Sequence, residues 1–93
     1  MKTIYIANKI SDQNGLSDSI KKINGKITTQ EREQIHRDFN DNVITEISIS
    51  VNIAFIGGVH YKKNGHDIEL KFVGDIVPSK QKEISDRIQH NIK

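Results

Sequence analysis

The chain contains no cysteine, only one proline, no tryptophan and only five aromatic residues, two tyrosines and three phenylalanines. Without cysteine it can form no disulfide, and it offers neither a thiol nucleophile nor a thiolate metal ligand. No apolar run approaches the length of about 18 residues that is typical of a membrane-spanning helix. The apolar run near the start is too short for the core of a signal peptide. These absences predict a cytoplasmic protein without membrane association.

Charge and size narrow the function classes further. Fourteen basic and twelve acidic side chains leave a net charge of +2, far from the dense positive surface of a dedicated duplex-DNA binder. A chain of 93 residues is sufficient for one domain, 1–93, and leaves no room for a second. The core is expected to be aliphatic and rich in isoleucine. Together, isoleucine, lysine and asparagine indicate an AT-rich genome, bacterial or phage.

A strand and a short helix are predicted in the first third of the chain. Residues 2–7 form a β-branched run typical of a strand, and the segment 11–15 is turn-forming. Leu16, Ile20 and Ile23 are spaced as one face of a helix, which the following Asn-Gly pair would end.

Two further helices carry start signals. Thr28 and Glu31 fit a capping box, which predicts a helix from there to about residue 39. Its buried stripe is narrow, and His36, among charged neighbours, is predicted to lie on the solvated face. Pro78 suits the first turn of a C-terminal helix. The apolar side of that helix is expected to contain Ile84, Ile88 and Ile92.

The clearest pattern is a strict alternation of apolar and polar residues from Glu46 to Phe55, typical of a strand with one wet face. Two turn signals follow, Gly57-Gly58 and Asn64-Gly65. A hairpin that turns at Gly57-Gly58 would place core residues opposite charged ones. In a hairpin that turns at Asn64-Gly65, apolar residues or glycines lie opposite each other on one face, and residues of complementary charge lie opposite each other on the other face. We therefore expect the turn at Asn64-Gly65.

The predicted hairpin therefore has one long strand, 46–62, bent or bulged at Gly57-Gly58. On its outer face His60 lies opposite Glu69. Residues 2–8 are expected to pair with 46–52 in the same chain. Two alternatives are that 46–52 stays an exposed edge of the sheet or that it pairs with a second subunit.

The elements occur in the order β-α-α-β-β-α and predict an α+β fold, a bent three-stranded antiparallel sheet with helices packed on one face. This order is similar to that of type I KH RNA-binding domains. The similarity is one of topology alone, because the G-x-x-G loop that defines those domains is missing and only Gly25 lies between the two helices.

Candidate catalytic and metal-binding residues do not converge in this fold. His60 and His66 have opposite strand parity, so they cannot easily bind one ion. Ser17 and its neighbours suit a helix start and have no nearby histidine. Glu69 and Asp75 lie on an open face, without the burial that shifts a pKa. We expect no enzymatic activity, no cofactor and no metal.

The outer face of the predicted sheet is flat and carries small polar side chains, which suits the docking of a protein or of a second copy. The residues expected to form it are Ser48, Ser50, Asn52, His60, Lys62, Glu69 and Lys71. The function expected is a small non-enzymatic binding protein with an unknown macromolecular partner. A phage or mobile-element protein that inhibits a host or defence enzyme would fit this description.

Two other functions stay open. One is RNA or DNA binding by lysines that would form a single patch if two loops meet, although among the aromatic residues only Tyr5 is a candidate for an outward position. These lysines are Lys21, Lys22, Lys26, Lys62 and Lys63. The other is a homodimeric regulator joined through the sheet edge.

Overall fold

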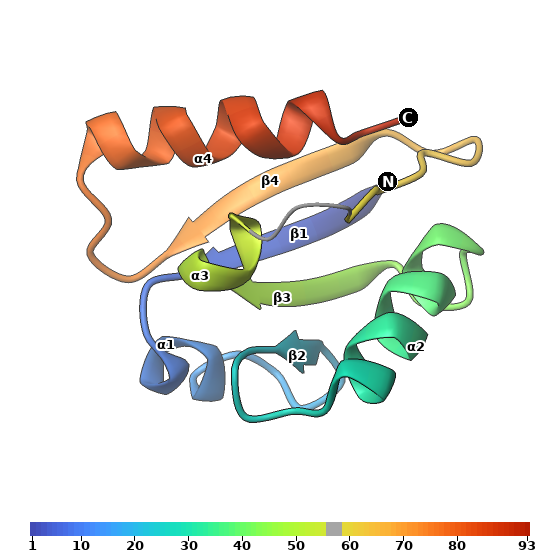
Figure 1. Cartoon of the computed structure of the whole chain (residues 1–93), viewed down its shortest axis with the longest axis horizontal. Coiled ribbons are helices and arrows are strands. Elements are labelled where there is room, and N and C mark those ends of the chain that lie inside the picture. Colours follow the sequence, from blue (N-terminus) through green and yellow to red (C-terminus); the bar gives the residue numbers. More distant parts are fainter. Residues whose placement is uncertain (56–58) are drawn as a thin grey trace.

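The computed structural model describes residues 1–55 and 59–93, in which strands and helices alternate along the chain (Figure 1). The elements are β1 (Lys2–Ala7), α1 (Ile10–Asn14), β2 (Lys21–Ile23), α2 (Thr29–Asn40), β3 (Glu46–Ser50), α3 (Val51–Ala54), β4 (Ile68–Val73) and α4 (Pro78–His90). A helix follows each strand, and this alternation is typical of parallel sheets, because the chain must return to the same end before the next strand.

In the described residues the strands form one four-stranded sheet in the order β2-β3-β1-β4, and every neighbouring pair is parallel. The predicted three-stranded antiparallel sheet is therefore wrong. Residues 2–7 do pair with the segment that begins at Glu46, but in the opposite direction to the one expected. The reason is that helical connections, rather than tight turns, lead into β3 and out of it.

The Asn64-Gly65 turn forms, but it does not join two paired strands. Both residues have positive φ, 48° and 86°, and the N–H of His66 donates to the carbonyl of Lys63 over 3.0 Å. This is the backbone that a two-residue turn of this sequence adopts. The strand after it pairs with β1 instead of folding back, so the predicted hairpin register is wrong.

The alternating segment splits into a strand and a short helix at Ser50. The Ser50 hydroxyl accepts a hydrogen bond from the N–H of Ile53 over 3.4 Å, as an N-cap residue does. Ile47 and Ile49, in the strand, and Ile53, in the short helix, are all buried. The predicted strand 46–62 therefore ends early, while the bend expected at Gly57-Gly58 lies outside the described residues.

The region between β1 and α2 also differs from the prediction. The segment 11–15, expected as a turn, lies largely in α1, and the expected helix at 16–23 is a turn followed by β2. Ile20 and Ile23 are nevertheless buried. Their spacing therefore predicted correctly that they are buried, but the prediction that they lie in a helix is wrong. With β2 in this place, the element order that is shared with KH domains no longer holds.

Two helices are confirmed at their start residues. The Thr28 hydroxyl accepts a hydrogen bond from the N–H of Glu31 over 3.1 Å, and Pro78 lies in the first turn of α4. Ile84 and Ile88 are fully buried on the inner side of α4, as their spacing predicted. None of the helices in the described part of the chain has both the length and the apolar character needed to cross a bilayer.

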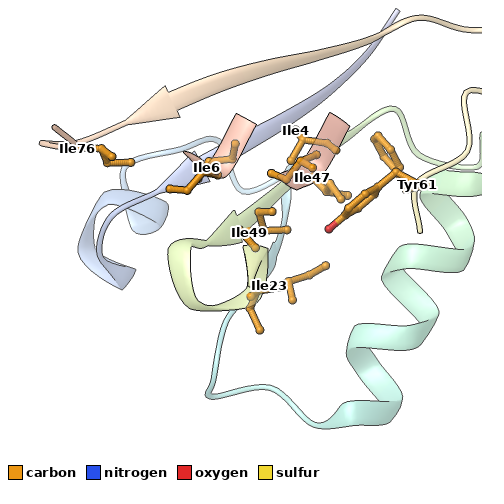
Figure 2. Packing of buried hydrophobic residues seen from close by; sticks show 12 residues of the cluster. Ile4, Ile6, Ile23, Ile47, Ile49, Tyr61 and Ile76 are labelled. Atoms are coloured by element: carbon orange, nitrogen blue, oxygen red, sulfur yellow. The ribbon is translucent and has the colours of Figure 1, made fainter. Parts of the chain in front are cut away.

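The core covers one face of the sheet. Ile4 lies beside Ile47 of β3, and Ile6 lies beside Ile49 of β3. Figure 2 shows these side chains on the same side of the sheet, together with the ring of Tyr61 from the segment before β4. Helices α2, α3 and α4 contribute the opposing side of this core, which is made of Phe39, Ile53, Ala54, Ile84 and Ile88.

Candidate interaction surface

The opposite face of the sheet, here called the outer face, carries the odd-numbered residues of β1 and β4 and the even-numbered residues of β3. The strand register arranges them in three rows across the sheet. The rows are Glu46-Thr3-Glu69, Ser48-Tyr5-Lys71 and Ser50-Ala7-Val73. The first two rows hold most of the polar groups, and they meet around the ring of Tyr5.

Part of the outer face is sealed by α1, which contacts β1 and β3. Gln13 of α1 is fully buried, and its side-chain NH₂ donates to the Ile23 carbonyl (3.1 Å) and to Ser48 Oγ (3.2 Å). Asn24 Nδ2 donates to Gln13 Oε1 over 2.9 Å, which completes the amide's bonds. This network satisfies the polar groups that the α1 contact buries. Over β1 and β4, in contrast, Glu69 and Lys71 are exposed.

Tyr5 is the centre of the open part. Its hydroxyl donates to Glu46 Oε2 over 2.8 Å, and Lys71 Nζ lies 5.9 Å from the centre of its half-buried ring. The hydrogen bond to Glu46, together with burial and the nearby negative charges of Glu46 and Glu69, raises the pKa of Tyr5 above its ordinary value. The hydroxyl therefore stays a donor at neutral pH, and the ring is held in one position.

The structure places the seven predicted face residues in three environments. Glu69 and Lys71 lie exposed on the outer face, next to Tyr5. Ser48 and Ser50 lie on the same face but are buried, at 0% and 9% exposure. The remaining three leave the sheet: Asn52 lies in α3, and His60 and Lys62 lie in the segment before β4.

Sequence reasoning placed Glu46 on the outer face but did not include Tyr5 in the protein-binding site, although a signal for Tyr5 was present. Tyr5 has the parity opposite to Ile4 and Ile6, and this parity alone puts it on the other face from the core.

A groove of about 410 Å³ lies between β2 and α2. It is lined by Lys21, Lys22, Ile27, Glu31, Gln34, Ile35 and Asp38. Lys22 Nζ is already hydrogen bonded to the Ser17 and Ile20 carbonyls, over 3.0 and 3.1 Å. Because Glu31 and Asp38 of α2 line the groove together with the two lysines of β2, the groove does not have the uniform positive charge that a polyanion requires.

The five predicted nucleic-acid lysines lie in two separate places. Lys21 and Lys22 belong to β2 and Lys26 follows it, at one edge of the sheet. Lys62 lies instead by the start of β1, where its carbonyl accepts a hydrogen bond from Lys2 Nζ. Lys63 follows it, and β3 lies between β1 and β2. The structure therefore does not join the two groups across one groove.

The buried titratable groups are hydrogen bonded to other groups inside the protein. Lys2 is 0% exposed, and its ammonium donates to the carbonyls of Phe39 (2.9 Å) and Lys62. His36 Nε2 lies 3.2 Å from Tyr61 Oη, and both residues are buried, so the prediction of a solvated His36 is wrong. Burial, assisted by the charge of Arg32, lowers the pKa of His36 from 6.5 to about 4.

These buried groups point to packing rather than to chemistry. Burial lowers the pKa of Lys2 and raises that of Tyr61, which favours the neutral form of each side chain. Both are sealed from solvent by the chain itself. Among the described residues, no three histidine, aspartate or glutamate side chains gather as a metal site would require.

Comparison with known proteins found no matching family model, no matching curated protein and no matching solved structure.

Proposed function

We propose that this chain is a small, non-enzymatic cytoplasmic protein that binds another protein through the open part of its outer face. The observation that carries the proposal is the uncovered parallel sheet around Tyr5. Parallel sheets are normally covered by helices on both faces. Here three helices contribute to the core on one face, while Glu69 and Lys71 on the other are exposed.

The residues around Tyr5 suit protein recognition. Tyrosine is enriched at binding hot spots, because its ring offers a large apolar area and its hydroxyl a polar contact. The bond to Glu46 orders the ring before binding, which reduces the entropy lost on association. With Glu46 and Glu69 in the same row, the partner surface expected is an apolar side chain that packs on Tyr5, flanked by a basic group.

Catalysis is not part of this proposal for a physical reason. General acid–base catalysis needs a titratable group that is positioned against an enclosed substrate. The carboxylates of the outer face, Glu46 and Glu69, are exposed on an open sheet, whereas the buried His36 and Lys2 are bonded inside the protein.

The test is capture of a binding partner by the immobilised protein, with matched variants. The wild type and Lys82→Ala, an exposed change on α4, are expected to retain the same discrete protein at low and high salt and after nuclease treatment. Tyr5→Ala, which removes the ring at the centre of the face, is expected to lower retention at least about tenfold. Thermal unfolding checks that each variant is folded, and equal retention by folded Tyr5→Ala would overturn the proposal.

The same experiment addresses the alternatives. An alternative outcome is that the protein retains RNA or DNA, and that this retention is lost at high salt and in the variants Lys21→Glu or Lys62→Glu. That result would show that the chain binds nucleic acid through its lysines. If the captured protein is an enzyme whose activity falls on binding, the chain is an inhibitor of that enzyme.

A further inference from the structure

Strand β4 forms an edge of the sheet and is paired on one side only. The N–H of Lys2 donates to the Asp67 carbonyl (2.8 Å) and that of Asn8 to the Val73 carbonyl (3.2 Å), so odd-numbered carbonyls face β1. Backbone groups alternate in direction along a strand, and the even-numbered residues therefore point theirs away from β1. These are Ile68, Leu70 and Phe72, whose outward N–H and C=O groups bond to no other described residue.

The two edges of the sheet differ in how they are protected. The edge strand β2 has only three residues, two of them lysines, and the carbonyl of Ile23 is taken by Gln13. Short, lysine-rich edges resist pairing with another chain. Strand β4 has six residues, and its charged side chains lie on the outer face rather than along the edge. The segment 46–52, considered above as a dimer edge, is excluded, because β3 is paired on both sides.

We propose that the β4 edge pairs with the β4 edge of a second copy, antiparallel, about a twofold axis at Leu70. Each copy then uses the same patch, as in an isologous dimer. Leu70 faces its own symmetry mate, Ile68 faces Phe72, and Glu69 faces Lys71. All outward backbone groups meet directly, which is the hydrogen-bonded arrangement of an antiparallel pair.

Charge complementarity selects this register. A shift of one residue would place core-facing side chains opposite outer-face side chains, which sheet pairing does not tolerate. A shift of two residues would place Glu69 opposite Glu69, or Lys71 opposite Lys71, and like charges directly opposite destabilise a pair. In the proposed register both cross-strand pairs on the outer face are Glu69 with Lys71. On the core side, the half-buried Ile68 and Phe72 cover each other.

The dimer joins two sheets into one and brings both outer faces onto one side. The dimer and the protein-binding face share Glu69 and Lys71, but the backbone pairing runs along the β4 edge and does not use the ring of Tyr5, so the dimer does not depend on the protein-binding function. Tyr5→Ala is expected to remain dimeric, so loss of partner capture and loss of dimerisation are separate results.

The experiment is sedimentation velocity over a range of protein concentrations. The wild type is expected to approach twice its mass of 10.6 kDa as concentration rises. Glu69→Lys and Lys71→Glu each create two like-charge pairs and are expected to raise the dissociation constant about tenfold. Both side chains are exposed, and circular dichroism melting confirms that the variants fold.

Two complementary samples test the register itself. The double variant, Glu69→Lys with Lys71→Glu, restores opposite charges and is expected to dimerise as the wild type does. An equal mixture of the two single variants is expected to form a heterodimer, while the control Lys82→Glu changes nothing. A wild type that stays monomeric at about 1 mM, a concentration at which a dimer with a dissociation constant of about 1 mM would already be seen, overturns the proposal. A folded double variant that stays monomeric does the same.

Discussion

At the scale of residues, the protein depends on a few buried polar side chains that no hydrophobic pattern predicts. Lysine is rarely buried without partners, yet Lys2 is sealed inside the protein. Its side-chain nitrogen lies at the C-terminal end of α2, where it donates to the Phe39 carbonyl, which also accepts from the Asn42 N–H, and meets the negative end of the helix dipole. The side chain of Asn40 makes two further bonds to the same segment. Its Nδ2 donates to the His60 carbonyl, and its Oδ1 accepts from the Lys62 N–H. Together these bonds attach the segment before β4 to α2.

The buried His36 predicts that stability depends on pH. Its pKa is near 4 in the folded protein and 6.5 in the unfolded chain, so both states are neutral above pH 6.5. Between pH 6.5 and 4 the unfolded chain binds a proton that the folded protein does not, and stability falls as pH falls. At one pKa unit per 1.36 kcal/mol, the loss is about 2 kcal/mol at pH 5. Urea unfolding at pH 7.5, 6 and 5 measures it.

The comparison for this prediction is between two single variants. His36→Phe keeps a ring beside Tyr61 but removes the titrating group, so its stability should fall by about 2 kcal/mol less over this pH range. His90→Phe, at an exposed position on α4, should keep the wild-type slope. Parallel slopes for His36→Phe and the wild type would contradict the buried, neutral histidine.

At the scale of elements, start signals made of specific side chains were reliable and spacing alone was not. Thr28 and Pro78 mark helix starts because a hydroxyl acceptor and a fixed φ have local consequences that tertiary contacts do not alter. Leu16, Ile20 and Ile23 show the opposite case. Their spacing fits a helix, but a turn and a three-residue strand bury Ile20 and Ile23 as well.

The glycines at the ends of elements predict a graded series of stabilities. Gly74, directly after β4, has φ +87°, and a Cβ there would overlap the Asp12 carboxylate, which accepts from the Lys9 N–H. Gly65 has φ +86° but open space around it, and Gly25 has open space and no positive φ. Substitution by alanine is expected to cost about 1–2 kcal/mol at Gly65 and more at Gly74. At Gly25 the change should stay within about 0.5 kcal/mol.

Chemical denaturation of the three alanine variants measures the series. The order of stability should be Gly25→Ala, then Gly65→Ala, then Gly74→Ala as the least stable. If Gly74→Ala unfolds at the same denaturant concentration as Gly25→Ala, the left-handed backbone after β4 and its contact with Asp12 are wrong.

At the scale of the whole molecule, strand direction decides which distant residues are neighbours. Glu46 and Glu69 both lie opposite Thr3, on either side of it. Their backbones are therefore two strand spacings apart, about 10 Å. In the antiparallel arrangement predicted from the sequence, Glu69 would instead face His60, which lies beyond the bend at Gly57-Gly58 in the strand that begins at Glu46.

Spin labels distinguish the two arrangements, and the lack of cysteine makes labelling simple. The double variant Glu46→Cys with Glu69→Cys is expected to show strong dipolar broadening in continuous-wave EPR. The two single-cysteine proteins, measured alone, report any broadening between copies and serve as controls. Spectra without broadening beyond that of the controls would contradict the parallel register.

The candidate surface was accessible to sequence reasoning only in part. The face shared by Ser48, Glu69 and Lys71 follows from residue parity and agrees with the strand register. The burial of Ser48 under Gln13 could not be predicted, because the sequence of α1 predicts a turn and not a helix.

The sequence by itself determined the strand at 2–7, the helices that begin at Thr29 and Pro78, and the isoleucines that form the core. These features depend on local backbone preferences and on which residues avoid water. Only the tertiary structure decided the direction and order of the strands, and with them the open face around Tyr5 and the free edge of β4. The physical reason is that alternate residues of a strand point to opposite faces whether its neighbour runs parallel or antiparallel, so one alternating pattern satisfies both sheets.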